Sequence, residues 1–465
     1  MDQQTTAEQL GAFVAQSRYE NLPATVVEKT KRHILDTFGA ALAGATSEEA
    51  ARTMAALSDS DEGGPAPVWG TAERTSARSA ALLNGIAAHA FELDDTGGCD
   101  HSGAVVLPAA VAALSLARQP VAGRAFIVAV VLGYDLGRRA LEAFRGYRPH
   151  NEAGWHSTGT CGTFGAAAAA ANLLQLSAAE ATSALGLAGS FSSGLWAFIH
   201  DGAMAKRVHA GRAAEGGLLA AFLARAGVTG PAHVFEDVWG GFLKTYAHGG
   251  TDPGALTRDL GESWRVMRGA IKPYASCRDT HAAVDAVGRI LARRALSPEE
   301  IAAVHARLSP FLAGMVGGRD ASTLPAAQMS LPYAIAARIL FGTAGLSAYS
   351  PERRADERLR AFLERVAIDL DESIVASDRA SVAIVTRDGE RIEEQTTTAL
   401  GAPDNPVGDR ELLAKYDELA AYVLPKAQAR TLADGVMSLE GMPDARDLLG
   451  LLARPGASAR RPGQA

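Results

Sequence analysis

The spacing of apolar residues changes twice along the 465-residue chain, and this change constrains the fold more than any other feature. Between Pro23 and Ala226, apolar residues recur three and four positions apart, which predicts a series of helices. Strand-like alternation begins only after Trp264, and helical spacing returns from Glu411. The sequence therefore predicts a mostly α protein with an inserted α+β domain. A chain of this length buries enough surface to fold without disulfides or a metal.

Residues that are typical of helix ends support the prediction of these helices. Pro23 suits a first helical turn, Ser47 followed by two glutamates suits an N-cap, and Gly227 suits a C-terminal cap. The remaining predicted helices are Ser76–Phe91, Val105–Leu116, Gly123–Phe144, Gly162–Leu174, Val208–Ala226, His281–Arg294, Leu331–Phe341 and Glu411–Leu424.

Predicted strands mark the inserted domain. Ala303–Leu308 and Val366–Leu370 alternate, and Ser381–Thr386 precedes an Asp-Gly turn that predicts a β-hairpin. We predict a large all-α helical domain built from both chain ends and a smaller α+β lid domain. The expected boundaries are 1–268 with 401–465 for the helical domain, and 269–400 for the lid.

Charge and cysteine content exclude several classes of protein. The 45 Lys and Arg against 52 Asp and Glu give a net charge of -7, and no basic stripe is present, so no nucleic acid partner is expected. Three scattered cysteines and an N-terminus without a signal-peptide pattern predict a cytoplasmic protein. Two uncharged stretches, 157–179 and 181–200, are rich in Ala and Gly, which indicates packed core helices and no membrane span.

The segment 92–103 collects acidic residues and a histidine between two apolar helices. Asp94, Asp95 and His101 are metal-ligand types, but HExxH or CxxC spacing is absent, so we predict no metal. A second interpretation is acid–base chemistry, in which carboxylates orient His101. A third is structural: Asp94 and Asp95 end one helix, while Asp100 and Ser102 cap the next.

Two further segments carry candidate residues. His156 precedes a helix start rich in small residues, where free backbone N–H groups could hold a carboxylate. Lys206 and Arg207 stand at a helix start, where cations are unfavourable; this indicates carboxylate binding or proton delivery, with a solvated surface pair as the alternative. The chain has neither a GxGxxG dinucleotide signature nor a GxSxG hydrolase signature.

A fourth group lies at the start of the predicted lid domain and contains Lys272, Tyr274, Arg278 and His281. These side chains supply many hydrogen-bond donors within a short segment. Ligand pockets favour domain junctions, so a binding site is expected here.

The four groups are most informative together. In chain order they read Asp94-Asp95-Thr96, His101-Ser102-Gly103-Ala104-Val105, Gly154-Trp155-His156, Gly162-Thr163, Met204-Ala205-Lys206, His209, Gly211, Lys272-Pro273-Tyr274, Ser276-Cys277-Arg278 and Thr280-His281. This set resembles the MmgE/PrpD family, which includes 2-methylcitrate dehydratase, cis-aconitate decarboxylase and iminodisuccinate epimerase. The resemblance covers nearly the whole chain. It implies a large helical domain with a smaller α+β lid, a homodimer, no metal and no organic cofactor.

The resemblance also implies roles for individual residues. The catalytic candidates are His101, His156, Lys206 and Lys272. The substrate-binding candidates are Asp94, Asp95, Thr96, Arg207, Tyr274, Arg278, His281 and Tyr333. Glu92 stands where decarboxylase-type members have Asp, the loop before His101 is one residue shorter, and Ser102 replaces a Pro. These departures bear on the identity of the substrate more than on the class of reaction.

Members of this family act on small polycarboxylates at a carbon next to a carboxylate. That chemistry needs cations to hold the substrate and an acid–base pair to move a proton. We expect a cofactor-independent lyase, either a dehydratase or a decarboxylase, for a di- or tricarboxylic acid such as 2-methylcitrate or cis-aconitate. The alternatives are an epimerase or isomerase of an amino- or imino-dicarboxylate such as iminodisuccinate, and an inactive scaffold. The four catalytic candidates are expected to line one cleft between the helical domain and the lid.

Overall fold

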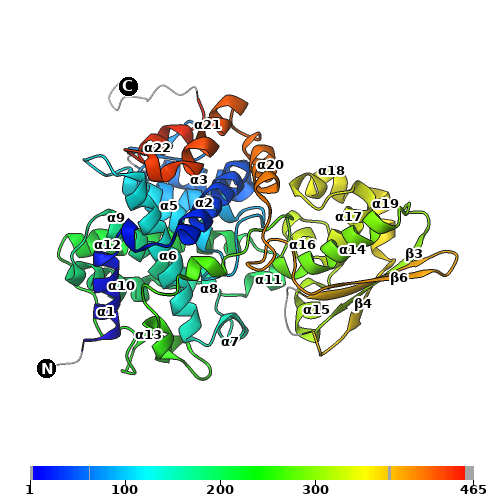
Figure 1. Cartoon of the computed structure of the whole chain (residues 1–465), viewed down its shortest axis with the longest axis horizontal. Coiled ribbons are helices and arrows are strands. Elements are labelled where there is room, and N and C mark those ends of the chain that lie inside the picture. The colour runs from blue at the N-terminus through cyan, green and yellow to red at the C-terminus, as the bar shows by residue number, and fades with distance from the viewer. Residues whose placement is uncertain (1–3, 62, 375–378, 456–465) are drawn as a thin grey trace. The chain divides into compact units, whose positions relative to one another are not determined.

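The computed structural model describes residues 4–61, 63–374 and 379–455, which form two compact units (Figure 1). The first unit holds the described parts of Met1–Ala90, Asp94–Gly269 and Asp409–Ala465. The second unit holds Phe91–Leu93 and the described parts of Ala270–Gly408. The first is helical and the second carries a sheet, so the predicted fold, mostly α with a smaller α+β part, is confirmed.

The helices of the first unit begin at the residues that the sequence indicates. Pro23 is the N-cap of α2, and the Ser47 hydroxyl accepts a hydrogen bond from the Ala50 N–H at the start of α3. The elements up to residue 268 are α1 Thr6–Gln16, η1 Tyr19–Asn21, α2 Ala24–Gly44, α3 Glu48–Ser58, α4 Ala77–His89, α5 Ser102–Leu114, α6 Gly123–Ala143, α7 Tyr147–Glu152, α8 Ser157–Thr160, α9 Gly162–Leu173, α10 Ala178–Phe191, α11 Phe198–Asp201, α12 Ala205–Arg225, α13 Phe242–Tyr246, η2 Pro253–Leu256 and η3 Arg265–Arg268.

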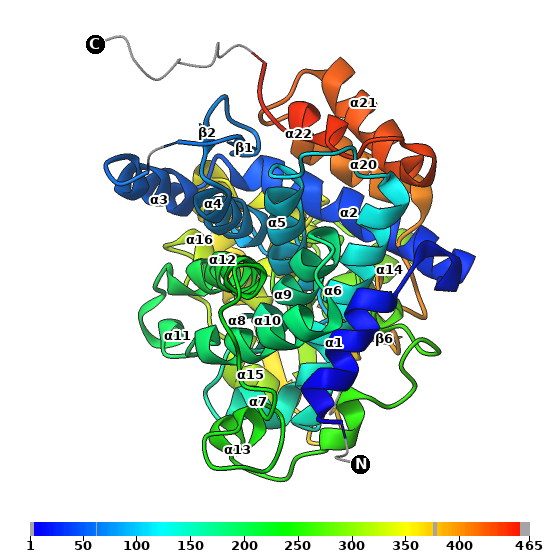
Figure 2. The same ribbon diagram turned by 90° about the vertical axis from the view of Figure 1, so that its left-hand side faces the viewer.

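Helix α9 forms the centre of the first unit. Every residue from Gly162 to Ala171 is buried, and α9 packs against α5, α6, α10 and α12 (Figure 2). Small side chains let these helices approach each other closely. Close packing inside the helical unit therefore explains why this segment is uncharged and rich in Ala. Among the described residues, no helix has both the length and the apolar character that crossing a membrane requires.

The C-terminal helices belong to the same unit as the N-terminal ones. They are α20 Asp409–Ala420, α21 Lys426–Met437, η6 Leu439–Gly441 and α22 Asp447–Leu451. Helix α20 packs on α2, where Lys415 Nζ lies 2.6 Å from Asp36 Oδ1 (Figure 1). The predicted helical body built from both chain ends is therefore confirmed.

The second unit is built on a four-stranded sheet in the order β4-β3-β5-β6. Its strands are β3 Ile301–Leu308, β4 Val366–Leu370, β5 Ala380–Thr386 and β6 Arg391–Thr396. Strands β3 and β4 run parallel, and the other pairs are antiparallel. The turn between β5 and β6 needs a left-handed residue, and Gly389 supplies it with φ 91°.

Helices complete the second unit. Helix α14 packs on β5 and β6, and α17 packs on α14. The helical elements are η4 Arg278–Thr280, α14 His281–Arg293, α15 Pro310–Val316, α16 Leu324–Gln328, α17 Leu331–Phe341, η5 Leu346–Tyr349, α18 Pro351–Arg354 and α19 Glu357–Leu363. The Gln328 amide donates to the Phe91 carbonyl at 2.7 Å, which attaches the segment 91–93 to this unit.

The first unit also contains a short pair of strands that the apolar spacing does not predict. Strands β1 Ala66–Pro67 and β2 Arg74–Thr75 form a short antiparallel pair. Two-residue strands are too short to show alternation, so periodicity could not reveal them.

Candidate active site

The segment between α4 and α5 positions a group of buried histidines. Helix α4 ends at His89, and His101 is the N-cap of α5. Two residues of the segment, Glu92 with φ 53° and Asp100 with φ 117°, have left-handed backbones that non-glycine residues rarely adopt. Strained backbone of this kind concentrates at functional sites, so the segment is a candidate site on geometry alone.

Asp94 joins two histidines through one carboxylate oxygen. Its Oδ2 lies 2.9 Å from His89 Nδ1 and 3.1 Å from His101 Nδ1, and all three residues are buried. Burial alone would raise the pKa of Asp94, but His89 and His101 hold it well below its usual value. Asp94 is thus a fixed negative charge that orients both rings.

His101 has carboxylates near both ring nitrogens. Its Nδ1 also lies 2.8 Å from the Asp95 carbonyl oxygen, and its Nε2 lies 3.5 Å from Asp100 Oδ2. The Thr96 hydroxyl donates to the other oxygen of Asp100 at 3.0 Å and fixes that carboxylate. A histidine with negative charge on both sides is well placed to carry and donate a proton.

Asp95 has a structural partner. Its Oδ1 accepts the Gly103 N–H at 2.8 Å, which satisfies a donor at the start of α5, and its Oδ2 lies 3.1 Å from His33 Nδ1. The capping hypothesis is therefore wrong in detail: Asp95, and not Asp100 or Ser102, accepts that N–H. The Ser102 hydroxyl instead accepts a hydrogen bond from the Cys99 N–H at 2.9 Å.

His156 lies against His209 in the same unit. Their Nδ1 atoms are 3.1 Å apart, and the ring of His156 stands 6.1 Å from that of His89 and 6.4 Å from that of His101. Gly194 leaves the space for this pair, because a Cβ there would lie 3.3 Å from the His209 ring. The histidines thus form one cluster, in which His89, His101 and His156 are buried and His209 is half-buried.

Burial and a nearby lysine keep two of these histidines neutral. Burial lowers the pKa of His156 well below its usual value, and the positive charge of Lys206 lowers it further. The same two causes lower the pKa of His209 to about 4. Lys206 lies one turn before His209 at the start of α12, so both residues belong to the same helix end. Lys206 and Arg207 are themselves buried, which excludes the hypothesis of a solvated surface pair.

A close contact between α4 and α12 holds these elements together. A Cβ on Gly85 of α4 would lie only 2.6 Å from the Cα of Gly211 in α12, so both positions need glycine. The contact fixes the first turns of α12, which carry Lys206 and His209, relative to α4, which ends in His89.

In the second unit, Lys272 forms a buried ion pair. Its Nζ lies 3.0 Å from Glu92 Oε2, and each side chain is only 1% exposed. Two opposite charges removed from water in this way stabilise each other, so removing either one is expected to be costly. Glu92 therefore belongs with Lys272.

The other second-unit candidates make hydrogen bonds within that unit. The Tyr274 hydroxyl donates to Asp285 at 2.6 Å, and His281 Nε2 lies 3.2 Å from the Ser276 carbonyl oxygen. Arg278 Nη1 donates to the Leu400 carbonyl at 2.7 Å. The Tyr333 hydroxyl donates to the Ala348 carbonyl at 2.8 Å, and its ring is fully buried. These contacts explain how the side chains are held; they do not test substrate binding.

Within the first unit, the structure thus brings His101 and His156 together and adds two residues that the list of site candidates lacked, His89 and His209, the latter one turn after Lys206. In the second unit it adds Glu92 as the partner of Lys272. His89 fell inside a predicted helix and so carried no motif signal. His209 lies one turn after Lys206, a spacing that could have indicated a shared helix face.

Three of the clustered histidines have the composition of a metal site. One ring nitrogen from each of His89, His101 and His156 lies within 4.8 Å of the other two. Asp94 would then serve as the outer carboxylate that orients two ligands. Lys206 opposes this, since its positive charge already acts on His156, one of the three rings.

A pH dependence of stability follows from the buried histidines. His150, outside the cluster, packs its ring 4.1 Å from that of Phe144, and burial lowers its pKa to about 4. An unfolded histidine titrates near pH 6.5, so between about pH 6.5 and 4 the unfolded chain binds more protons than the folded chain. We therefore expect the free energy of unfolding to fall as the pH falls, by up to about 1.4 kcal/mol per pH unit for each such histidine.

Urea unfolding at pH 7, 6 and 5 measures this slope. The slope of the unfolding free energy against pH should be shallower for His150→Gln, by the amount that one fewer bound proton accounts for. The same change at the exposed His248 should leave the slope unaltered. Equal slopes for the wild type and His150→Gln would contradict the assignment.

Known proteins of similar sequence identify the family to which the chain belongs. The MmgE/PrpD N-terminal domain matches residues 8–253, and the MmgE/PrpD C-terminal domain matches residues 274–440. A cis-aconitate decarboxylase-like protein of Aspergillus oryzae is 30% identical over 467 residues, which cover 95% of each chain. The cis-aconitate decarboxylase of Aspergillus terreus is 31% identical, covering 94% of this chain and 93% of its own. The human cis-aconitate decarboxylase is 28% identical, with coverage of 94% and 92%. The chain therefore belongs to the MmgE/PrpD family and is an enzyme of its lyase type.

Proposed function

We propose that the protein is a cofactor-independent decarboxylase of a small unsaturated tricarboxylic acid of the cis-aconitate kind. The similar proteins of two Aspergillus species and of human carry that activity, or likeness to it, in their names. The observation that carries the proposal is the buried cluster itself. It combines a histidine flanked by carboxylates, a neutral histidine and a lysine in one place.

The proposed reaction breaks one carbon–carbon bond. The carboxylate on the saturated carbon leaves as CO₂, and its bonding electron pair forms a new C=C bond. The old C=C pair moves to the carbon next to the far carboxylate, which takes up one proton. Lys206 would stabilise the negative charge that develops there, as a fixed cation does in a site shielded from water.

His101 would supply that proton. Its Nδ1 is engaged by Asp94 and the Asp95 carbonyl, so Nε2 is the nitrogen that faces the reaction, with Asp100 to hold the charged ring. Solvent then returns the proton to His101. A positioned acid of this kind contributes roughly 10²–10⁴-fold to the rate.

A second candidate reaction follows from the neutral state of His156. A neutral imidazole can remove a proton from a carbon next to a carboxylate, and His101 could return one to the same carbon. This would be an epimerisation or isomerisation of an amino- or imino-dicarboxylate without loss of a group. Dehydration of a 2-methylcitrate-like acid would use the same pair to remove a proton and to protonate the departing hydroxyl.

The experiment that tests the proposal separates these reactions by product. The protein is incubated with cis-aconitate, 2-methylcitrate or iminodisuccinate in deuterated water, and the products are followed by NMR. We expect CO₂ release from cis-aconitate to be the fastest reaction. If cis-aconitate stays intact and 2-methylcitrate is turned over, the protein is a dehydratase and not a decarboxylase. If cis-aconitate stays intact and deuterium exchanges into iminodisuccinate, it is an epimerase.

Lys272 stays a catalytic candidate on its match to the family motif, and Glu92 is the ion-pair partner that holds it. The remaining substrate-contact assignments stay predictions: Asp94, Asp95, Thr96, Arg207, Tyr274, Arg278, His281 and Tyr333. The expectation that the four catalytic residues share one cleft is a prediction of the same kind, as is the cytoplasmic location.

The reaction is proposed to need no metal. We expect kcat to survive exhaustive dialysis against a chelator, because the charge of Lys206 opposes a divalent cation at the three histidines. If chelation abolishes turnover and a divalent ion restores it, His89, His101 and His156 are metal ligands instead.

The protein is also proposed to be a homodimer, as the family resemblance implies. Light scattering at micromolar concentration should give twice the chain mass of 48.3 kDa. A mass of one chain would refute this part without affecting the proposed reaction.

A further inference from the structure

The first unit carries an open cavity of about 760 Å³ that no step of the proposed reaction uses. Its lining includes Arg138, Arg145, Arg258, Arg265 and Arg268. We propose that this arginine cavity binds a small polyanion with carboxylate or phosphate groups, and that binding stiffens the segment leading into His101. The proposal goes beyond the proposed function and does not depend on it.

The cavity has more positive charge than its acidic residues neutralise. Glu142 is surrounded by three guanidinium groups, with its oxygens 3.0 Å from Arg138 Nε, 2.9 Å from Arg265 Nε and 3.4 Å from Arg268 Nε. Burial alone would raise the pKa of Glu142, but Arg138 and Arg265 hold it below its usual value, so it stays charged. The whole lining has five arginines against three carboxylates, Glu142, Asp252 and Asp259, which leaves two positive charges for a ligand.

Arg145 is the least engaged of the five arginines. It makes no ion pair with any residue that the structure describes, and its side chain lies along Gly250, where a Cβ would be 3.1 Å from its Nε. Its φ of 63° ends helix α6, where the Arg145 N–H donates to the Glu142 carbonyl and the Gly146 N–H to the Leu141 carbonyl. This helix end places Arg145 in the lining of the cavity.

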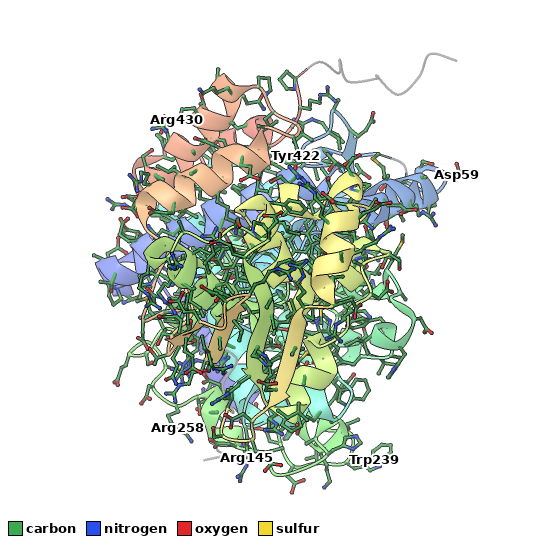
Figure 3. All side chains as sticks on the ribbon, turned by 90° about the vertical axis from the view of Figure 1, so that its right-hand side faces the viewer. Asp59, Arg145, Trp239, Arg258, Tyr422 and Arg430 are labelled. Atoms are coloured by element: carbon green, nitrogen blue, oxygen red, sulfur yellow. The ribbon has the colours of Figure 1, made fainter. Side chains whose placement is uncertain are left out.

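Arg258 also lines the arginine cavity. Its Nη2 contacts both oxygens of Asp252, at 3.1 and 3.0 Å, and its side chain is 54% exposed. Arg258 and Arg145 are labelled close together at the lower edge of Figure 3, and both line the cavity. An anion with two charged groups could bridge them.

Arg138 connects the cavity to the candidate active site. Its Nη1 donates to the Gly97 carbonyl at 3.1 Å and lies 3.4 Å from the Gly98 carbonyl oxygen. These glycines stand between Thr96 and His101. An anion in the cavity would fix the Arg138 guanidinium, and with it the backbone that precedes His101.

The chemistry of the cavity defines the ligand class. Guanidinium groups bind carboxylate and phosphate oxygens in bidentate geometry. Citrate serves as the tricarboxylate probe and inorganic pyrophosphate as the phosphate probe. The net charge of -7 argues against a long nucleic acid, so a small molecule is the expected ligand.

Isothermal titration of the full-length protein with each probe tests the proposal. The double variant Arg145→Ala, Arg258→Ala should weaken binding at this cavity by at least about tenfold per lost guanidinium. Arg52→Ala on α3, an exposed arginine paired with Glu48, is the matched control and should change nothing. Amide exchange at Gly97 to Asp100 should slow when the probe binds to the wild type, but not to the double variant.

Binding of either probe with this loss in the double variant supports the proposal and identifies the ligand group. Circular dichroism checks that the double variant folds; if it does not, Arg268→Ala replaces it, because that side chain is 62% exposed. Unchanged affinity in the folded variant overturns the proposal, and so does absence of binding at about 5 mM of both probes. The experiment measures binding and amide exchange and does not measure turnover. Its outcome therefore does not depend on which reaction the protein catalyses.

Discussion

Replacing His101 by asparagine is expected to lower kcat/KM for cis-aconitate by about 100-fold or more. The ring is the only proton-donating group in the described cluster with carboxylates near both nitrogens, Asp94 at 3.1 Å and Asp100 at 3.5 Å. Asparagine keeps a hydrogen-bonding group for Asp94 but cannot carry the proton. Steady-state kinetics with CO₂ detection measure the loss, and circular dichroism checks the fold.

Lys206→Met should have an effect of similar size, since it removes the positive charge that lowers the pKa of His156. Its matched control is Lys244→Met, a half-exposed lysine paired with Asp237 outside the site. If Lys206→Met and Lys244→Met retain the same kcat/KM, Lys206 has no part in catalysis.

Lys272→Met should destabilise the protein by about 3–5 kcal/mol, the usual cost of leaving one partner of a buried ion pair behind. The methionine fills most of the space, but it removes the ammonium that lies 3.0 Å from the buried Glu92 carboxylate. Urea unfolding at neutral pH measures the difference in free energy. Lys244→Met, whose partner Asp237 is exposed, should change stability by less than about 1 kcal/mol.

The double variant Lys272→Met, Glu92→Leu separates loss of packing from loss of charge pairing. Removing both charges should restore most of the stability, because an apolar pair of similar volume carries no desolvation cost. A double variant as unstable as Lys272→Met alone would show that the ion pair is not the cause.

Helices and strands could be predicted from the sequence where the apolar spacing extends over many residues and where capping or turn residues mark its ends. The predicted helix Leu331–Phe341 agrees with α17 to the residue, and the structure adds Ser330 as its N-cap and Gly342 as its left-handed C-cap. The predicted hairpin followed from an Asp-Gly turn between alternating segments, and it is present as β5 and β6. In such segments local preference and tertiary structure agree, so the sequence alone is sufficient.

The contacts of the candidate site could be predicted only in part. The motifs indicated His101, His156 and Lys206, because these residue types stood out from their surroundings. His89 did not stand out, since a histidine at the end of an apolar helix is typical of a core position. Its place beside Asp94 depends on the left-handed backbone at Glu92 and Asp100, which no sequence pattern indicates.

The pairing of Lys272 with Glu92 could not be predicted for another reason. The two residues are 180 positions apart, and their contact depends on the segment 91–93 joining the second unit. A departure from the family pattern, Glu where Asp is common, drew attention to the position but not to its partner.

The most direct test of the central claim is decarboxylation of cis-aconitate in deuterated water by the wild type and by His101→Asn. We predict that the wild type releases one CO₂ for each substrate consumed and places one solvent deuteron on the carbon next to the far carboxylate. His101→Asn should lose both signals in parallel by about 100-fold. No CO₂ from the wild type, or undiminished release by folded His101→Asn, would contradict the proposed function or the proposed site.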